Sequence, residues 1–433
     1  MVQTARIPSA GDVSGMTAAT TGPITLAAAG RRVTSSAIRD LLTVVERPEV
    51  ISLAGGLPAA ETFPVAEIAG AIAELLATES TRALQYSTTE GYLPLRTMVA
   101  DWHGTVADQV LMTHGSQQAL ELVVRATVDP GAEVALADPG YVGAIQAFRL
   151  AGARLTAIPT DADGMIVEAL AERLAQGCRP VLVYVVPNFH NPTSATLAID
   201  RRRSLGALAE RYGFLIVEDD PYGHLRWAGD ALPALRSFSG RVVSLGTISK
   251  LLCPGLRVGY AVAPPGLAGP LVTLKQAVDL HTSTLGQMTA HRVLATPGFL
   301  PGHVDRVRLL YQHRATALAA AVAEHLGAVA SFRPAEGGMF LWIRLDRPDV
   351  DTHDLLEGAV AAGVAYVPGR AFGIDDRHPH ELRLSFSGVP PSDLDEGVRR
   401  LAASLLPPGR RYPLNHPAHG GSGARRTDMP DRL

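Results

Sequence analysis

The middle of the chain alternates short apolar runs with amphipathic stretches. Four apolar runs, rich in valine, leucine and isoleucine, predict buried strands at residues 134–137, 181–186, 214–217 and 242–245. The segments between them have helical periodicity, at residues 117–127, 142–150 and 201–211. Because continuous apolar strands separated by helices form βαβ units, this pattern predicts an α/β fold around a mostly parallel, buried sheet.

The pattern changes towards both ends of the chain. Beyond residue 303 it predicts a long helix at 304–326 and short strands at 339–345 and 382–386. Before the central region it predicts a helix at 35–46, a short strand that enters a Gly/Pro turn at 51–58, and a helix at 66–77. We therefore expect the following division: a flexible arm at 1–24, a segment at 25–60 that joins the smaller domain, a large domain at 61–302, a smaller α+β domain at 303–406 and a disordered tail at 407–433.

Composition excludes several classes of protein. The 433 residues have a formal net charge of −3, so a strongly basic face for nucleic acid is not expected. No apolar run is long enough for a membrane span, and the first residues have no secretory pattern. Cys178 and Cys253 are far apart, and the histidines lack metal-ligand spacing, so neither a disulfide framework nor a metal site is predicted. We expect a cytoplasmic protein.

The chain contains only two lysines, Lys250 and Lys275; every other basic residue apart from the histidines is an arginine. Arginine cannot replace lysine where an amine must lose its proton and attack a carbonyl. Lys250 follows the strand at 242–245 in a loop rich in small residues, which is a common place for a catalytic group, although by itself a surface lysine is an equally good interpretation. Lys275 lies in a helix-like segment, and we interpret it as a structural residue near a subunit interface.

Polar and aromatic side chains follow each predicted strand. In α/β sheets ligands bind at the carboxyl ends of the strands, so these residues are expected to share one site. The set comprises a small-residue turn that opens a helix, an aromatic ring, an amide, a carboxylate with a phenol, and the amine: Gly115–Gln117, Tyr141, Asn191, Asp219 with Tyr222, and Thr247–Lys250. Asp220 is interpreted as a residue that caps a helix, before Pro221, an interpretation that suits Asp219 poorly.

In this order the motifs resemble the pyridoxal-phosphate (PLP) enzymes of the class I/II aminotransferase family, fold type I. The resemblance covers about residues 35–405. Five phrases are similar to the branch that contains 2-aminoadipate and kynurenine aminotransferases: SLAGGLP (52–58), LQYSTTEGY (84–92), THGSQQA (113–119), GMF (338–340) and VPG (367–369). The resemblance implies a large domain with a mostly parallel seven-stranded sheet.

The resemblance also implies roles for the strand-end residues. Lys250 would bond to the cofactor aldehyde and then move a proton between the substrate Cα and the cofactor. Asp219 would pair with the pyridinium nitrogen and keep the ring protonated. Tyr222 and Asn191 would hydrogen-bond the ring oxygen and tune the pKa of the lysine.

The cofactor phosphate would bind between a helix start and a cationic loop. The residues implied for it are Gly115, Ser116, Gln117, Thr247, Ser249 and Arg257. Tyr141 would stack on the cofactor ring, and Tyr86 would reach the phosphate of the neighbouring subunit. We therefore expect a homodimer with composite active sites.

The substrate is expected to lie against the smaller domain. Arg383 would take the substrate α-carboxylate bidentately, beside Asn191 and Gly56. Arg39 either contacts the distal end of the substrate or is held away from it by Asp40. The sequence does not decide between these two positions of Arg39.

The sequence favours a PLP-dependent aminotransferase that moves the amino group of an L-amino acid to a 2-oxo acid by a ping-pong mechanism. A second hypothesis keeps the cofactor but uses the same carbanion for elimination, cyclisation or oxidation. A third is a non-catalytic regulator in which this fold is fused to a DNA-binding domain, but no basic helix-turn-helix pattern is present.

Overall fold

The computed structural model describes residues 24–32, 47 and 49–405. Its largest element is an eight-stranded sheet with the order β2-β9-β8-β7-β6-β3-β4-β5. The strands are β2 (Val110–Thr113), β3 (Glu133–Asp138), β4 (Arg154–Asp161), β5 (Gly164–Met165), β6 (Leu182–Val185), β7 (Leu215–Asp219), β8 (Val242–Thr247) and β9 (Gly259–Val262). β5 and β9 run antiparallel to their neighbours, and the other strands share one direction.

The α/β class and the mostly parallel sheet are confirmed, but the sheet has one strand more than the seven expected. The additional strand, β5, is only two residues long and pairs with the end of β4 at the edge of the sheet. So short a strand leaves no run of apolar residues and no alternation in the sequence, which is why its pattern did not predict it.

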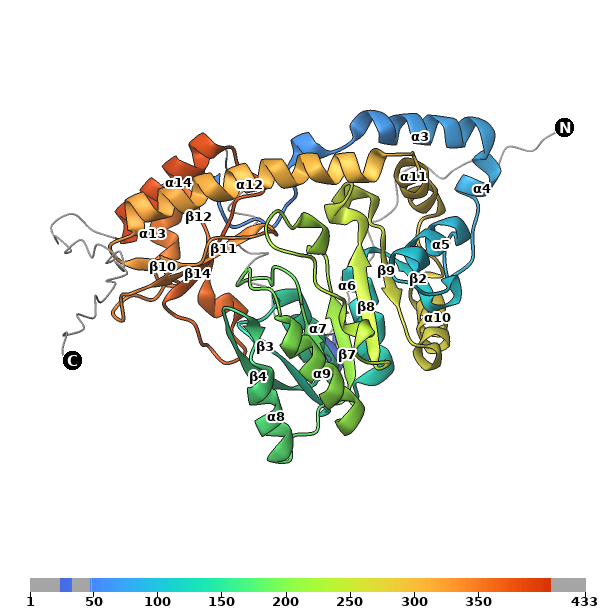
Figure 1. Ribbon diagram of the computed structural model, residues 1–433, viewed down its shortest axis with the longest axis horizontal. Helices are drawn as coiled ribbons and strands as arrows, with labels where there is room; N and C mark the ends of the chain where they lie inside the picture. The colour runs from blue at the N-terminus through green and yellow to red at the C-terminus, as the bar shows by residue number, and fades with distance from the viewer. Residues whose placement is uncertain (1–23, 33–46, 48, 406–433) are drawn as a thin grey trace, which may run out of the picture.

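Helices cover both faces of the sheet because its strands are apolar on both sides (Figure 1). In β3, Val134 and Leu136 pack towards α6 (Gly115–Thr127) and α7 (Val142–Ala151). Ala135 and Ala137 pack on the opposite face, towards α8 (Val167–Ala175) and α9 (Ile199–Tyr212). The rest of that second face is covered by three further helices: α3 (Val65–Thr78), α5 (Leu93–Trp102) and α11 (Thr284–Leu294).

A second group of elements comes mostly from the C-terminal third. A four-stranded sheet has the order β10-β11-β14-β13, and β1 (Ile51–Ser52) pairs in parallel with β12 (Val364–Ala365). The other strands are β10 (Ala330–Phe332), β11 (Phe340–Leu345), β13 (Val367–Pro368) and β14 (Glu381–Ser385). The helices of this group are α13 (Leu356–Ala361) and α14 (Pro391–Leu405). The domain boundaries given above stay a prediction.

One long helix, α12 (Phe299–Leu326), runs along both groups of elements (Figure 1). Most of its buried apolar residues, from Val307 to Leu326, belong to a continuous apolar cluster that contains Val243 of the large sheet and Leu394 of α14. The remaining α-helices of the described residues are α1 (Ala28–Arg32), α4 (Ser80–Leu84) and α10 (Pro265–Asp279). The helix expected at 35–46 lies outside the described residues.

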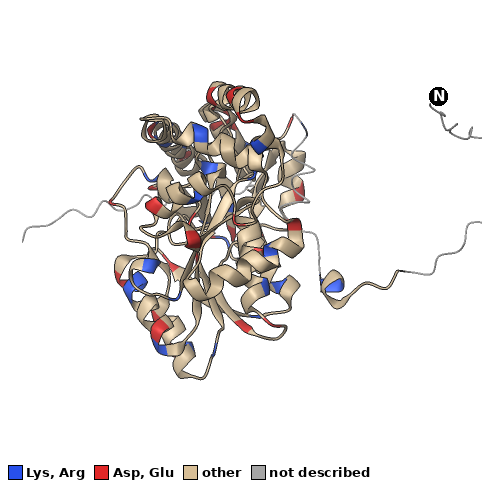
Figure 2. Ribbon diagram, turned by 90° about the vertical axis from the view of Figure 1, so that its right-hand side faces the viewer, with Lys and Arg blue, Asp and Glu red and all other residues tan. Residues whose placement is uncertain are grey.

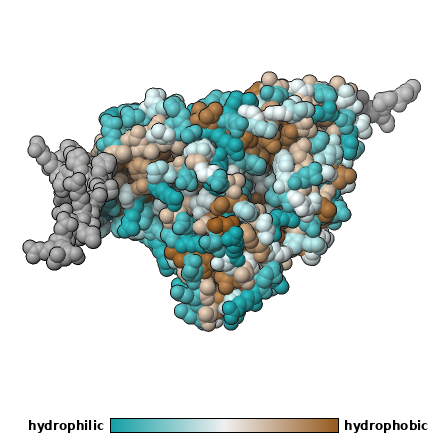
Figure 3. Space-filling model, in the orientation of Figure 1, coloured by the Kyte–Doolittle hydropathy of each residue, from teal (hydrophilic) through white to brown (hydrophobic). Residues whose placement is uncertain are grey.

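The surface is mixed in charge and polarity. Figure 2 shows Lys and Arg interspersed with Asp and Glu over the described ribbon. On the face in Figure 3, hydrophobic residues occur in small groups among hydrophilic ones. Among the described residues, no helix is both long enough and apolar enough to cross a membrane.

Candidate active site

A cavity of about 520 Å³ lies at the carboxyl ends of the central strands. It brings together residues that are more than 300 positions apart in the sequence. The residues expected at the site that line it are Gly56, Gly115, Ser116, Gln117, Tyr141, Asn191, Asp219, Tyr222, Thr247, Ser249, Lys250, Arg257 and Arg383. Two expected residues do not: Tyr86 is not among the lining residues, and Arg39 lies outside the described residues.

Lys250 is placed by β8, because this strand ends at Thr247 and a single 3₁₀ turn, Ile248–Lys250, follows it. The side chain of Thr247 accepts a hydrogen bond from the backbone N–H of Ser249 at 3.1 Å, which fixes the start of the turn. The Lys250 Nζ donates to the carbonyl oxygen of Gly56 at 3.1 Å. Burial, together with the nearby Arg257 and Arg383, lowers the pKa of Lys250 to about 8. A neutral amine is therefore accessible near physiological pH.

Asp219 is the last residue of β7 and is buried. Its Oδ2 accepts a hydrogen bond from the phenol of Tyr184 at 2.8 Å. Its Oδ1 is buried and has no hydrogen-bond partner among the described residues. Burial raises the pKa of Asp219 to about 7, against the lowering effect of Tyr184. A buried carboxylate oxygen without a partner is costly, so this atom marks a place for a cationic or N–H donor group.

Asp220 has a structural role that differs from that of Asp219. Its Oδ1 accepts from the backbone N–H of Gly223 at 2.8 Å, and its Oδ2 accepts from Asn188 Nδ2 at 2.7 Å. Both oxygens are thus used to shape the turn that carries Tyr222; the 3₁₀ helix that follows, Gly223–Leu225, has Tyr222 at its N-cap and no side-chain cap. Of these two neighbours, only Asp219 keeps an oxygen that has no hydrogen-bond partner among the described residues.

The turn at the start of α6 is tightly packed against Arg257. Gly115 has φ +75°, and a Cβ built there would lie 2.7 Å from Arg257 Nη2. A Cβ on Gly259 would lie 2.4 Å from the carbonyl carbon of Gly115. The helix start therefore needs glycine at both positions. It presents the free N–H groups of its first turn beside a fixed guanidinium, which is a favourable arrangement for a phosphate.

Hydroxyl groups and an aromatic ring complete this side of the cavity. Thr247 Oγ1 donates to Ser249 Oγ at 2.9 Å. The phenol of Tyr141, at the start of α7, donates to Gln117 Oε1 at 3.2 Å. Burial, with a contribution from Asp219, raises the pKa of Tyr141 to about 12, so its phenol stays protonated.

Arg383 enters the cavity from β14 of the smaller sheet. Its Nη1 donates to Asn191 Oδ1 and its Nη2 to the carbonyl oxygen of Ala54, each at 2.7 Å. The guanidinium lies 4.1 Å from the ring centre of Phe340 and 5.0 Å from that of Phe372. Burial lowers the pKa of Arg383 to about 10, so it remains cationic at neutral pH. Its Nε has no hydrogen-bond partner among the described residues.

These residues fit PLP. The cofactor needs a reactive amine, an anion for its ring nitrogen and donors for its phosphate. The cavity offers Lys250, the unpartnered oxygen of Asp219 and the α6 start with Arg257.

Several lining residues were not predicted from the sequence, and of these Tyr184 and Phe340 make the clearest contacts. Tyr184 lies inside an apolar strand run, where an aromatic residue is normally read as core packing. Its hydroxyl was the available signal, because a buried phenol needs a hydrogen-bond partner. Phe340 belongs to the GMF phrase quoted above, but its stacking on Arg383 depends on how β11 and β14 pair.

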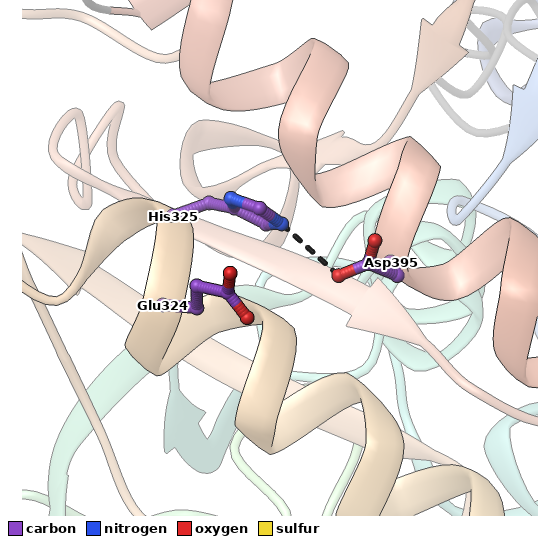
Figure 4. A group of neighbouring side chains, drawn as sticks. All are labelled: Glu324, His325 and Asp395. Carbon is purple, nitrogen blue, oxygen red and sulfur yellow. Dashed lines mark hydrogen bonds and ion pairs between the residues drawn. The ribbon is translucent and has the colours of Figure 1, made fainter.

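A group of possible metal ligands lies away from the cavity, in the part of the chain that the structure describes. Glu324 and His325 near the end of α12 lie close to Asp395 of α14, with ligand atoms within 4.8 Å of one another (Figure 4). His325 Nε2 and Asp395 Oδ1 are 3.0 Å apart. Glu324 and Asp395 are exposed. We interpret the His325–Asp395 contact as a hydrogen bond that links the two helices.

Comparison with known proteins identifies the family. The family model described as aminotransferase class I and II matches residues 48–401. An aromatic-amino-acid aminotransferase from Thermococcus litoralis is 40% identical over 383 residues, which cover 86% of this chain and 91% of the relative. A 2-aminoadipate transaminase from Thermus thermophilus is 41% identical over 379 residues, which cover 86% and 94%.

The fold agrees with this assignment. The crystal structure of a kynurenine aminotransferase from Pyrococcus horikoshii, in complex with PMP, matches with a TM-score of 0.84 and 39% identity. The match covers 88% of this chain and 96% of that one. The expected activity and cofactor are confirmed. The chain belongs to the class I and II aminotransferase family and is a PLP-dependent aminotransferase.

Proposed function

We propose that the enzyme transfers the amino group of an L-amino acid to a 2-oxo acid in two half-reactions at the cavity described above. The observation that carries the proposal is the convergence of an amine, a buried carboxylate and a buried guanidinium on one cavity: Lys250, Asp219 and Arg383. When bound, PLP supplies an electrophilic aldehyde and a ring that accepts the electron pair from the substrate Cα. The ping-pong order follows because the amino donor and the 2-oxo acid acceptor bind in turn at the same site.

Lys250 is the proposed acid and base. A pKa of about 8 lets the amine take a proton at neutral pH and return it, which a group with an ordinary lysine pKa does poorly. The Gly56 carbonyl, 3.1 Å away, orients the amine. Asp219 is proposed to hold a protonated ring nitrogen with its free Oδ1, while Tyr184 orients the other oxygen.

Arg383 is the proposed binding residue for the substrate α-carboxylate. Its guanidinium is held by Asn191 and by the Ala54 carbonyl, and it stacks on Phe340, so it is oriented before the substrate arrives. A buried cation favours a carboxylate because desolvation strengthens the pairing. The relatives act, by their names, on aromatic amino acids, 2-aminoadipate and kynurenine. We propose a donor with a long side chain of this kind.

We also propose a cytoplasmic homodimer. Several large apolar side chains between residues 57 and 93 are exposed: Leu57, Val65, Leu84, Tyr86 and Leu93. Tyr86 is 78% exposed and contacts the ring of His281 edge-on. An exposed apolar group of this kind favours a protein contact, and in a dimer Tyr86 would reach the partner's phosphate site.

A half-reaction screen tests the proposed function. Purified holoenzyme is mixed with single amino acids while the cofactor spectrum is followed and the products are identified. We expect conversion to the aminated cofactor with one equivalent of 2-oxo acid, reversed by a second 2-oxo acid. The Lys250→Ala variant should retain the fold but show no conversion. Release of ammonia or consumption of oxygen in place of amino transfer would instead support elimination or oxidation.

A further inference from the structure

The second lysine, Lys275, is completely buried near the end of α10. Its Nζ donates to Gln118 Oε1 at 3.1 Å and to the two carboxylate oxygens of Asp279 at 2.7 and 2.8 Å. An ammonium has three N–H donors, and this site offers three acceptor atoms. A guanidinium has five donors in a flat fork and could not be satisfied there. This explains why lysine is retained at 275 in an arginine-rich chain.

Asp279 gathers the side chains around it. Its Oδ2 also accepts from Gln118 Nε2 at 2.6 Å and lies 2.8 Å from His114 Nδ1. Burial alone would raise the pKa of Asp279, but the hydrogen bonds from Gln118 and Lys275 outweigh it and lower the pKa. The carboxylate is therefore ionised, and His114 carries a proton on Nδ1 to donate to it.

This cluster ends at the turn that precedes the phosphate-binding helix start. Gln118 Oε1 accepts from the backbone N–H of His114 at 2.8 Å, and the His114 carbonyl accepts from Arg257 Nη2 at 3.1 Å. His114 immediately precedes Gly115, the first residue of α6. α10 and α6 lie against each other (Figure 1). A chain of hydrogen bonds thus connects the end of α10 to the peptide before the helix and to the guanidinium that faces the cavity.

We propose that Lys275 and Asp279 are positioning residues for the phosphate site. They act through Gln118, which ties the peptide N–H of His114, and through His114, which orients Arg257. None of these four residues, Lys275, Asp279, Gln118 and His114, lines the cavity, so their effect is on the geometry of the donors that do. The inference rests on the proposed placement of the cofactor phosphate at the α6 start.

The test measures cofactor affinity in two variants of the full-length enzyme. Lys275→Met removes the ammonium, and Gln118→Met removes the link but keeps the Lys275–Asp279 pair. Both should raise the PLP dissociation constant about tenfold or more, since each breaks hydrogen bonds to charged groups. The phosphorus resonance of bound PLP should move towards that of free PLP. kcat at saturating PLP should change far less than PLP affinity. Lys275→Arg should not restore affinity, although it restores the charge.

Two controls make the result decisive. Glu121→Gln breaks the Glu121–Arg125 pair on the same helix, away from the turn, and should leave PLP affinity unchanged. Should Lys275→Met fail to fold, Gln118→Met decides the question. The inference fails, and the proposed phosphate site stands, if Gln118→Met binds PLP with wild-type affinity and an unshifted resonance while Arg257→Met binds PLP more weakly. Unchanged affinity in Arg257→Met as well would show that the phosphate lies elsewhere, so the proposed site itself would fail.

Discussion

At the scale of single residues, the site depends on shifted protonation equilibria. The pKa of Lys250 is lowered to about 8, and the pKa of Asp219 is raised to about 7. Both shifts come first from burial, which disfavours the charged form of each group. The two neighbours at the end of β7 differ because Asp220 uses both oxygens locally, whereas Asp219 keeps one without a partner among the described residues.

The lysine pKa predicts how the apoprotein takes up its cofactor. Below pH 8 the amine is mostly protonated, and its neutral fraction falls about tenfold per pH unit. The rate of covalent attachment of PLP to Lys250 should therefore rise with pH through 8 and then level off. The measurement is borohydride trapping of PLP on the apoprotein at graded pH, with peptide mapping. A rate that stays flat across pH 8 would contradict the depressed pKa.

At the scale of elements, the strand ends and the helix start determine the site. The turn before α6 is specified by backbone geometry, since Gly115 is left-handed and in contact with Arg257. The place of this turn at a strand-to-helix junction was predictable from sequence, but its assignment to a phosphate came from the family resemblance, because a glycine at a helix start is by itself usually just a cap, and that assignment stays a prediction. The Tyr184–Asp219 hydrogen bond was not, since it requires the pairing of β6 with β7. Likewise, β5 is too short to leave a pattern.

Substitution of Gly115 and of Gly131 separates the effect of backbone strain from the effect of a new contact with Arg257. Gly115→Ala forces an alanine into positive φ, at a cost of roughly 1–2 kcal/mol, and also displaces Arg257. Gly131→Ala carries the same backbone strain, with φ +86°, but its Cβ meets nothing within 4 Å. Both variants should lose stability in chemical denaturation, Gly115→Ala at least as much as Gly131→Ala, and only Gly115→Ala should bind PLP more weakly. Equal PLP affinity in the two variants would contradict the close-packed turn.

At the scale of the whole molecule, α12 joins the two groups of elements into one apolar cluster. Leu318 is completely buried there, whereas Leu309 on the same helix is 67% exposed. Nothing local in the sequence distinguishes a helix that packs against one sheet from a helix that packs against both. Periodicity therefore predicted the helix, and only the assembled fold shows that its buried side is shared.

The shared cluster predicts that the two groups unfold together. Leu318→Ala should lower the free energy of unfolding by about 2–5 kcal/mol, because it leaves a cavity in the core. Calorimetry and near-ultraviolet circular dichroism should then report one transition at a lower temperature. Leu309→Ala is the matched control and should change the unfolding free energy by less than about 0.5 kcal/mol. Two separate transitions in the Leu318 variant would show that the groups unfold independently.

The scarcity of lysine has a practical consequence for the whole chain. One side-chain amine, Lys275, is sealed in the interior, and the other, Lys250, opens only into the catalytic cavity. General amine-directed reagents, such as crosslinkers and fluorescent esters, therefore find no lysine on the outer surface. Apart from the α-amino group of the chain, a small reagent of this type would modify only the active-site lysine, and bound cofactor would shield that lysine from it. Counting modified side chains would then report the fraction of molecules that lack their cofactor.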